Sequence, residues 1–148
     1  MIFNPTFLKM ALDRIRIEPD LQPTPDGSVT HCNQYCQRIA EDLGEKDLWG
    51  GAVMANDMIA YMDAHPEKFF KFSDHMKAWQ MVNDGSLIFP AQREVGHGHL
   101  CPLRPSVGME TSGNWKAQVP FCSNVGKTVG IMGVNYAFRT PPDYYAVK

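Results

Sequence analysis

The sequence predicts a single α+β domain, because helix-like segments fill its first part and short strand-like runs fill the rest. Its 148 residues can bury one hydrophobic core and are too few for two domains of ordinary size. Up to residue 85 the apolar residues recur at spacings of three and four, as on one face of a helix. From residue 87 onward short apolar runs alternate with Gly, Pro and Ser, which is typical of antiparallel strands.

Four helices are expected in the first part of the chain. The clearest pattern lies between Thr30, at the N-cap position, and Gly44, at the C-cap position. Ser73 caps the last helix, which ends at the Asn-Asp-Gly turn of residues 83–85. The expected helices cover residues 5–15, 31–43, 53–64 and 73–82, with a loop over residues 18–28.

Four short strands are expected in the second part, at residues 87–89, 99–103, 119–123 and 134–138. Pro102 falls inside the second of them. Because proline has no N–H, a bulge or a sheet edge is expected there. Residues 139–148 contain the pair Pro141-Pro142 and are expected to form a loosely attached tail.

Composition and charge exclude several classes of function. With 14 basic and 16 acidic residues the net charge is −2, so the chain lacks the basic excess of nucleic-acid-binding proteins. Residues 92–148 alone carry 6 basic and 3 acidic residues, which suits an anionic substrate. No apolar run has the length of a membrane span, and the N-terminus lacks a signal-peptide pattern. We therefore expect a protein made in the cytoplasm, without a membrane partner, whose four cysteines are free thiols.

Cys32 is the candidate nucleophile. Its place in the first turn of the second expected helix predicts a lowered thiol pKa, because free N–H groups and the helix dipole stabilise the thiolate. Cys36, one turn further on, fits a small buried residue better. The N–H of Cys32, with Asn33 and Gln34, is the candidate oxyanion site.

The base and its partner are expected further along the chain. Two histidines, His97 and His99, open the second expected strand, and a nucleophilic thiol needs such a base near it in space. Because both point to the same face of a strand, the periodicity does not choose between them. Asn124 is the candidate to orient the imidazole, and it equally suits a turn before Val125-Gly126.

Four motifs follow one another in the chain: Thr30-His31-Cys32-Asn33-Gln34-Tyr35, Ala78 through Asn83-Asp84-Gly85, Gly98-His99-Leu100, and Arg104-Pro105. Together they resemble the NlpC/P60 and CHAP families of peptidoglycan hydrolases, in which a Cys-Asn pair opens a helix, an Ala-rich helix ends at a Gly, and a Gly-His-Val segment forms a strand. The resemblance implies a single catalytic domain over residues 1–148 with its core at about residues 28–138. It implies a papain-like fold, with N-terminal helices packed on a small antiparallel sheet. It also implies amide-bond cleavage in peptidoglycan stem peptides, by an endopeptidase or amidase with Cys32 as nucleophile, His99 as base and Asn124 as third member.

The chain departs from the family pattern at two places. The duplicated Gly-His leaves His97 as an alternative base, and Cys101-Pro102 stands where the families have Val or Ala. A catalytic domain without a wall-binding module resembles phage lysins and secreted amidase effectors. That likeness implies a monomer that needs no cofactor, acts on the cell wall after release or secretion, and has an inhibitor or immunity protein as a partner.

Two other classes of function remain open on the sequence. Thiol and imidazole groups suited to zinc occur at Cys32, Cys36, His97, His99, Cys101 and Cys122, although without a Cys-x-x-Cys knuckle. Alternatively, the domain binds a partner without catalysis through aromatic segments at Trp49, residues 69–72 and residues 136–138, which equally suit a core. If Cys32 does react, the sequence does not separate hydrolysis from acyl transfer to an amine.

Overall fold

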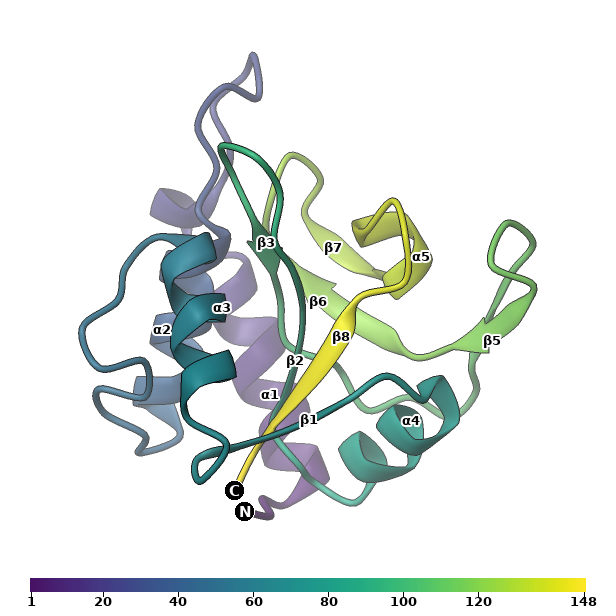
Figure 1. Cartoon of the computed structure of the whole chain (residues 1–148). Helices are drawn as coiled ribbons and strands as arrows, with labels where there is room; N and C mark the ends of the chain where they lie inside the picture. The colour runs from purple at the N-terminus through teal and green to yellow at the C-terminus, as the bar shows by residue number, and fades with distance from the viewer.

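A four-stranded antiparallel sheet in the order β1–β8–β2–β3 forms the middle of the molecule (Figure 1). The computed structural model describes all 148 residues of the chain. The strands are β1 (Phe69–Phe72), β2 (Ile88–Gln92), β3 (His99–Leu100) and β8 (Asp143–Val147). Ala146 of β8 pairs with Phe70 on one side and with Ile88 on the other, so the C-terminal strand lies inside the sheet. The expectation of a loosely attached tail is therefore wrong, because Tyr144 and Tyr145 are core residues.

A second hairpin extends the sheet beyond β3. It consists of β6 (Phe121–Asn124) and β7 (Gly130–Gly133), and a bridge between Leu103 and Cys122 joins it to the chain that follows β3. Pro102 lies between β2 and β6. Its carbonyl accepts from the N–H of Ser123 in β6, and the N–H groups of its neighbours Cys101 and Leu103 donate to carbonyls of β2. The expected sheet-edge position is thus wrong, because strands lie on both sides of the proline. Its two neighbours supply the N–H groups that bond to β2.

Three helices gather on one side of the sheet and the fourth long helix lies apart (Figure 1). They are α1 (Pro5–Arg16), α2 (Cys32–Asp42), α3 (Ala55–Ala64) and, apart from these, α4 (His75–Asn83). All four expected helices are confirmed to within two residues at each end. The expected N-caps are wrong: His31 rather than Thr30 precedes α2, without a side-chain capping bond, and Asp74 rather than Ser73 caps α4 by accepting from the N–H of Lys77. The expected C-cap glycine is confirmed, since Gly44 follows α2 with a φ of +89°.

The remaining elements are short. A hairpin of β4 (Glu110–Ser112) and β5 (Ala117–Val119) precedes β6, and Pro120 separates β5 from β6 where one strand was expected. Residues 134–138, expected as a strand, form the helix α5 (Val134–Ala137) instead. The chain leaves the sheet at Gly133, where the N–H of Val134 donates to the carbonyl of Pro120 and a single helical turn follows. A 3₁₀ turn, η1 (Pro19–Leu21), lies within the expected loop.

Tyr35 fixes the start of α2 against its neighbours. Its buried hydroxyl donates to the carbonyl of Leu12 in α1 at 2.9 Å and bonds the hydroxyl of Ser123 in β6 at 2.6 Å. The buried face of α2 repeats at the helical period, as the sequence predicts, through Cys32, Tyr35, Cys36, Ile39 and Ala40. The turn that carries Cys32 is therefore held against both α1 and β6.

The α+β class predicted from the sequence is confirmed, with helices and a mainly antiparallel sheet around one apolar core. That core runs from Leu8 in α1 to Val147 in β8. None of the helices has both the length and the hydrophobicity that a membrane crossing requires.

Candidate active site

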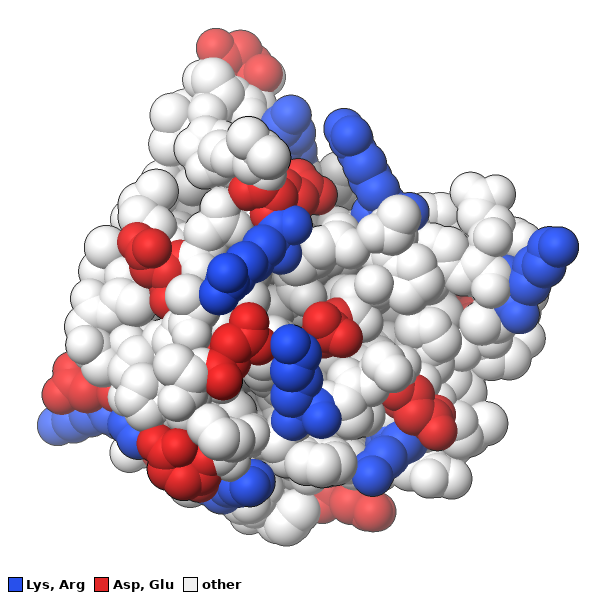
Figure 2. Space-filling view, in the orientation of Figure 1, with Lys and Arg blue, Asp and Glu red and all other residues white.

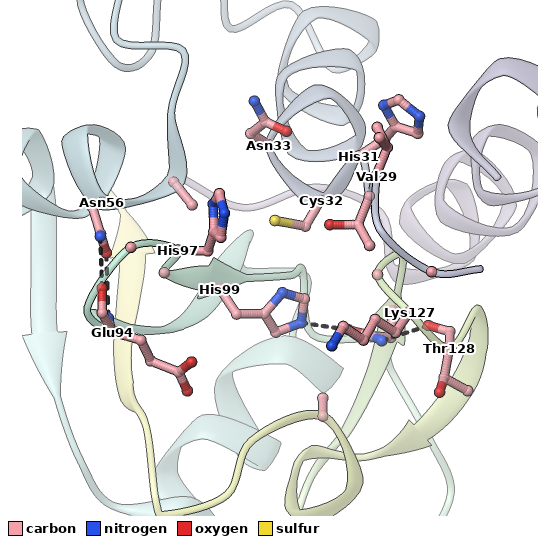
Figure 3. Close-up of a pocket in the computed structure, with 18 of the residues that line it drawn as sticks. Val29, His31, Cys32, Asn33, Asn56, Glu94, His97, His99, Lys127 and Thr128 are labelled. Atoms are coloured by element: carbon pink, nitrogen blue, oxygen red, sulfur yellow. Dashed lines mark hydrogen bonds between the residues drawn. The ribbon is translucent and has the colours of Figure 1, made fainter. Parts of the chain in front are cut away.

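Cys32 is the first residue of α2, and its sulfur points into a cavity at the end of the sheet (Figure 3). The side chain is nearly covered, with 7% of the residue exposed. The N–H groups of Cys32, Asn33 and Gln34 have no backbone partner, because the helix begins here and no side chain caps it. The helix start therefore presents free donors next to the thiol.

Burial controls the pKa of Cys32. Loss of water around the sulfur raises the thiol pKa above its ordinary value, and the nearby N–H groups of Leu100, Asn33 and Cys32 only partly oppose this. The lowered pKa expected from the helix N-terminus is thus wrong, because desolvation outweighs the backbone donors. The resting group is a neutral thiol, which needs a base to remove its proton.

His99 and Asn124 form a hydrogen-bonded pair on neighbouring strands. The Nε2 of His99, at the start of β3, lies 2.7 Å from the Oδ1 of Asn124, at the end of β6. The amide nitrogen of Asn124 donates to the carbonyl of Thr128 at 2.7 Å, so its oxygen is the atom that faces the ring. Because that oxygen only accepts, Nε2 must carry the hydrogen and Nδ1 is the unprotonated nitrogen. Figure 3 shows Nδ1 on the side of the ring that faces the Cys32 sulfur.

The surroundings of His99 keep it neutral and hold its ring in place. Burial lowers the pKa of His99, although the bond to Asn124 and the charge of Glu94 act in the opposite direction. The ring packs against Phe138 with centroids 5.0 Å apart. Gly126 covers its other side so closely that an added β-carbon would lie 3.3 Å from the ring carbon Cε1. A neutral, fixed imidazole is the state that a general base requires.

The two candidate histidines differ in their surroundings. His97 lies in the loop before β3, not on the strand, so the argument that both share one strand face does not apply. It is exposed and makes no side-chain hydrogen bond, whereas His99 is partly buried and bonded to Asn124. Both rings line the cavity near Cys32 (Figure 3). Of the two, His99 has the fixed orientation expected of a base.

The cavity has a volume of about 780 Å³, within the range of ligand-binding pockets. Five chain segments far apart in the sequence line it: residues 27–34, 54–56, 94–99, 124–128 and 136–139. Cys32, His99 and Asn124 all belong to this lining, so the structure brings the three predicted catalytic residues to one cavity.

The side chains expected at the oxyanion site behave differently from each other. The amide nitrogen of Asn33 is already bonded to the carbonyl of Val53, which fixes the loop before α3, so it has a structural role. Gln34 is exposed at the cavity wall without a side-chain bond. The backbone N–H groups of Cys32 and Asn33, which lie at the sulfur, are the better oxyanion donors.

Sequence reasoning missed Asn56, which shapes the cavity wall from α3. Its side-chain nitrogen donates to the carbonyl of Glu94 at 2.8 Å, and its oxygen accepts from the N–H of Glu94 at 3.4 Å (Figure 3). Gly98 lies directly against this amide, since an added β-carbon would come within 2.2 Å of its oxygen. Asn56 therefore anchors the loop that leads into His99. No sequence pattern marks it, because the pairing joins segments that only the fold brings together.

The other thiols lie in the core. Cys36, Cys101 and Cys122 are completely buried as free cysteines, and Cys36 donates to the carbonyl of Leu100 at 3.7 Å. Nowhere in the chain do three His, Cys, Asp or Glu side chains form a group suited to a metal ion. The six candidate zinc ligands therefore do not converge.

Three of the six aromatic residues considered as a partner surface are core residues. Trp49, Phe69 and Phe138 are buried, and Trp49 packs edge to face on Phe89. Phe70 and Tyr136 are exposed, by 37% and 69%, and Tyr136 lies at the rim of the cavity. Comparison with known proteins adds no identification, because neither the family models nor the curated proteins match this chain.

Proposed function

We propose that the protein is a cysteine hydrolase that cleaves amide bonds in the stem peptides of bacterial peptidoglycan. The observation that carries the proposal is the bond between His99 and Asn124, which leaves Nδ1 of the ring unprotonated and turned toward Cys32. A thiol, a neutral imidazole and an amide that orients it form the set used for nucleophilic catalysis by cysteine. We further propose that the fold is papain-like, since the thiol opens a helix that packs on a sheet carrying the other two residues.

The first half of the reaction forms an acyl-enzyme. Nδ1 of His99 takes the proton of the Cys32 thiol as the sulfur attacks the carbonyl carbon of the scissile amide. The negative charge that develops on the carbonyl oxygen is stabilised by the N–H groups of Cys32 and Asn33. The imidazolium then gives its proton to the amine, the C–N bond breaks, and a thioester remains on Cys32.

The second half releases the acid. His99 is neutral again and removes a proton from a water molecule, whose oxygen attacks the thioester carbon. The C–S bond breaks, the sulfur takes the proton back from His99, and the carboxylic product leaves. Throughout, Asn124 accepts from Nε2 and keeps the ring in the tautomer that presents a free nitrogen to the sulfur.

The substrate class comes from the sequence resemblance and agrees with the form of the cavity. A cavity of about 780 Å³ that is open to solvent and lined by backbone and polar groups suits an extended peptide better than a small apolar ligand. The motifs around Cys32 and His99 resemble those of the NlpC/P60 and CHAP hydrolases, which act on wall peptides.

The decisive experiment measures loss of turbidity of purified peptidoglycan, followed by mass analysis of the released fragments. The wild type should solubilise the wall, and Cys32→Ala should not, with an unchanged circular dichroism spectrum. The fragment masses then identify the cleaved bond, and fragments coupled to an added amine would show acyl transfer in place of hydrolysis. A wild type without activity on walls of several types would refute the proposal. Full activity of Cys32→Ala would refute it as well.

The choice of base is tested in the same assay. His99→Ala should lose nearly all activity, whereas His97→Ala should retain most of it, because only His99 is oriented by a side-chain partner. The opposite result would assign the base to His97.

A further inference from the structure

Three charged side chains line the catalytic cavity without forming an ion pair. Glu94 comes from the loop between β2 and β3, Lys127 from the turn between β6 and β7, and Arg139 from the segment after α5. All three are exposed, and none belongs to any of the ion pairs of the protein. By contrast, the carboxylate of Asp13 is bonded to both Arg16 and Arg104. The charges at the cavity are therefore available to a ligand.

Glu94 and Lys127 lie on opposite sides of the reactive centre. In Figure 3 the carboxylate of Glu94 lies on the side of His97, Lys127 lies beyond the other side of His99, and the Cys32 sulfur lies between the two sides. Figure 2 shows acidic and basic side chains together at the end of the molecule where these loops lie. The charge of Glu94 reaches the reactive centre, because it acts to raise the pKa of His99.

Hydrogen bonds hold the main chain in place near both Glu94 and Lys127. Asn56 holds Glu94 through two hydrogen bonds to its main chain. The turn that carries Lys127 is closed by the bond from Asn124 to the carbonyl of Thr128, and the side-chain stem of Lys127 lies close to Gly27. The separation between the charges is thus a property of the fold rather than of two free loops.

We propose that the cavity selects a zwitterionic stem peptide, with an ammonium group on the Glu94 side of the scissile amide and a carboxylate on the Lys127 side. The proposal rests on the proposed function and specifies its substrate. An uncross-linked diamino acid in a stem peptide supplies a free ammonium group, and the same stem supplies free carboxylates. Cross-linking turns that ammonium group into a neutral amide, so the protein should prefer uncross-linked stems.

The test compares three forms of one soluble, uncross-linked disaccharide-peptide: unmodified, N-acetylated on the free amine, and methylamidated on the carboxylates. For the wild type, kcat/KM should fall roughly fivefold to tenfold on either modification, as for the loss of one charge contact at an exposed site. Glu94→Gln should have the same kcat/KM on the unmodified and N-acetylated forms. The variant Lys127→Met should have the same kcat/KM on the unmodified and methylamidated forms.

Two matched variants control for the change of charge alone. Glu67→Gln and Lys46→Met alter exposed residues outside the cavity and should discriminate among the three substrates as the wild type does. Equal wild-type kcat/KM on all three substrates would overturn the inference while leaving the hydrolase intact. Retention of wild-type discrimination by both cavity variants would overturn it as well. Failure of the proposed function looks different, because the wild type would then be as inactive as Cys32→Ala on the unmodified peptide.

Discussion

The Nε2 of His99 lies 2.7 Å from the Oδ1 of Asn124, although 25 positions separate the two residues in the chain. Since the nitrogen of Asn124 is already bonded to Thr128, its oxygen is a fixed acceptor. The pair therefore sets both the rotation and the tautomer of the imidazole, and the chemistry at Cys32 depends on it.

Replacing Asn124 by Asp should shift the pH dependence of activity. His99 acts as a base only when it is neutral, and its pKa is lowered in the wild type by burial. A carboxylate at position 124 would stabilise the imidazolium, so the acid limb of the kcat/KM profile should move to higher pH by about one to three units. Asn124→Ala should instead lower kcat by about 10²-fold with little change in KM, because the ring loses its orientation. Superimposable pH profiles of wild type and Asn124→Asp would exclude this coupling.

Alkylation by iodoacetamide should modify Cys32 alone in the folded protein. The other three thiols have no exposed surface, whereas 7% of Cys32 is exposed in the cavity. Because burial raises the pKa of Cys32 above its ordinary value of 9.0, the alkylation rate should keep rising with pH beyond that value. Peptide mapping by mass spectrometry identifies the site, and the rates are followed from pH 6 to about pH 10. A rate that levels off near neutral pH would mean that the resting pair is a thiolate and an imidazolium.

A methyl group on Gly126 should disturb His99 without unfolding the protein. The β-carbon of Gly126→Ala would lie 3.3 Å from Cε1 of the ring and 3.6 Å from Nδ2 of Asn124, so the pair must move by a few tenths of an ångström. A displacement of this size should lower kcat by less than about 10²-fold, the cost of a full 1 Å error. Gly108→Ala is the matched control, because nothing lies within 4 Å of its added carbon. Equal kcat for both variants would mean that the ring tolerates the contact.

The free energy of unfolding should decrease as the solution is made mildly acidic, in part through His99. Burial lowers the pKa of His99 in the folded state, so below about pH 6.5 the unfolded chain binds the proton more readily. Above that pH both states are neutral at this position and the residue contributes no pH dependence. Below it, stability should fall by up to about 1.4 kcal/mol per pH unit until the folded-state pKa is reached.

Urea denaturation of wild type and His99→Gln at pH 7.5 and pH 5.5 measures this contribution. The variant should lose less stability between the two values, while His75, whose pKa burial also lowers, contributes equally to both proteins. The same loss in wild type and variant would show that His99 takes up its proton equally well in the folded state.

The sequence predicted the parts of the site that depend on local pattern. The spacing of Cys32, Tyr35 and Ile39 predicted the helix and its buried face correctly. The family resemblance implied that Cys32, His99 and Asn124 share one site, and all three line one cavity. The raised pKa of Cys32 was not predicted from the sequence, because the depth of its burial is set by strands that lie far away in the sequence.

Two elements show why the rest of the fold was missed. The short apolar run of residues 134–138 predicted a strand, although periodicity alone does not distinguish such a run from a buried helix. These residues form α5, which begins where the N–H of Val134 donates to the carbonyl of Pro120. Strand β8 is buried on both faces, so it lacks the alternation of a half-exposed strand, and the prolines before it suggested a loop. In both cases a tertiary contact overrides the local pattern.

Removal of residues 143–148 should abolish folding, although a terminal segment is usually dispensable. Residues 143–147 form β8, which pairs with β1 on one side and with β2 on the other. Loss of Tyr144 and Tyr145 from the core alone should cost more than about 6 kcal/mol, which is comparable to the whole stability of a typical domain. Removal of Lys148 alone is the control, because that residue is exposed and lies outside β8. Circular dichroism and urea denaturation should show an unfolded longer truncation and a native control. A longer truncation that still unfolds cooperatively would mean that the sheet closes without its inner strand, and Cys32 would then be positioned by the helices alone.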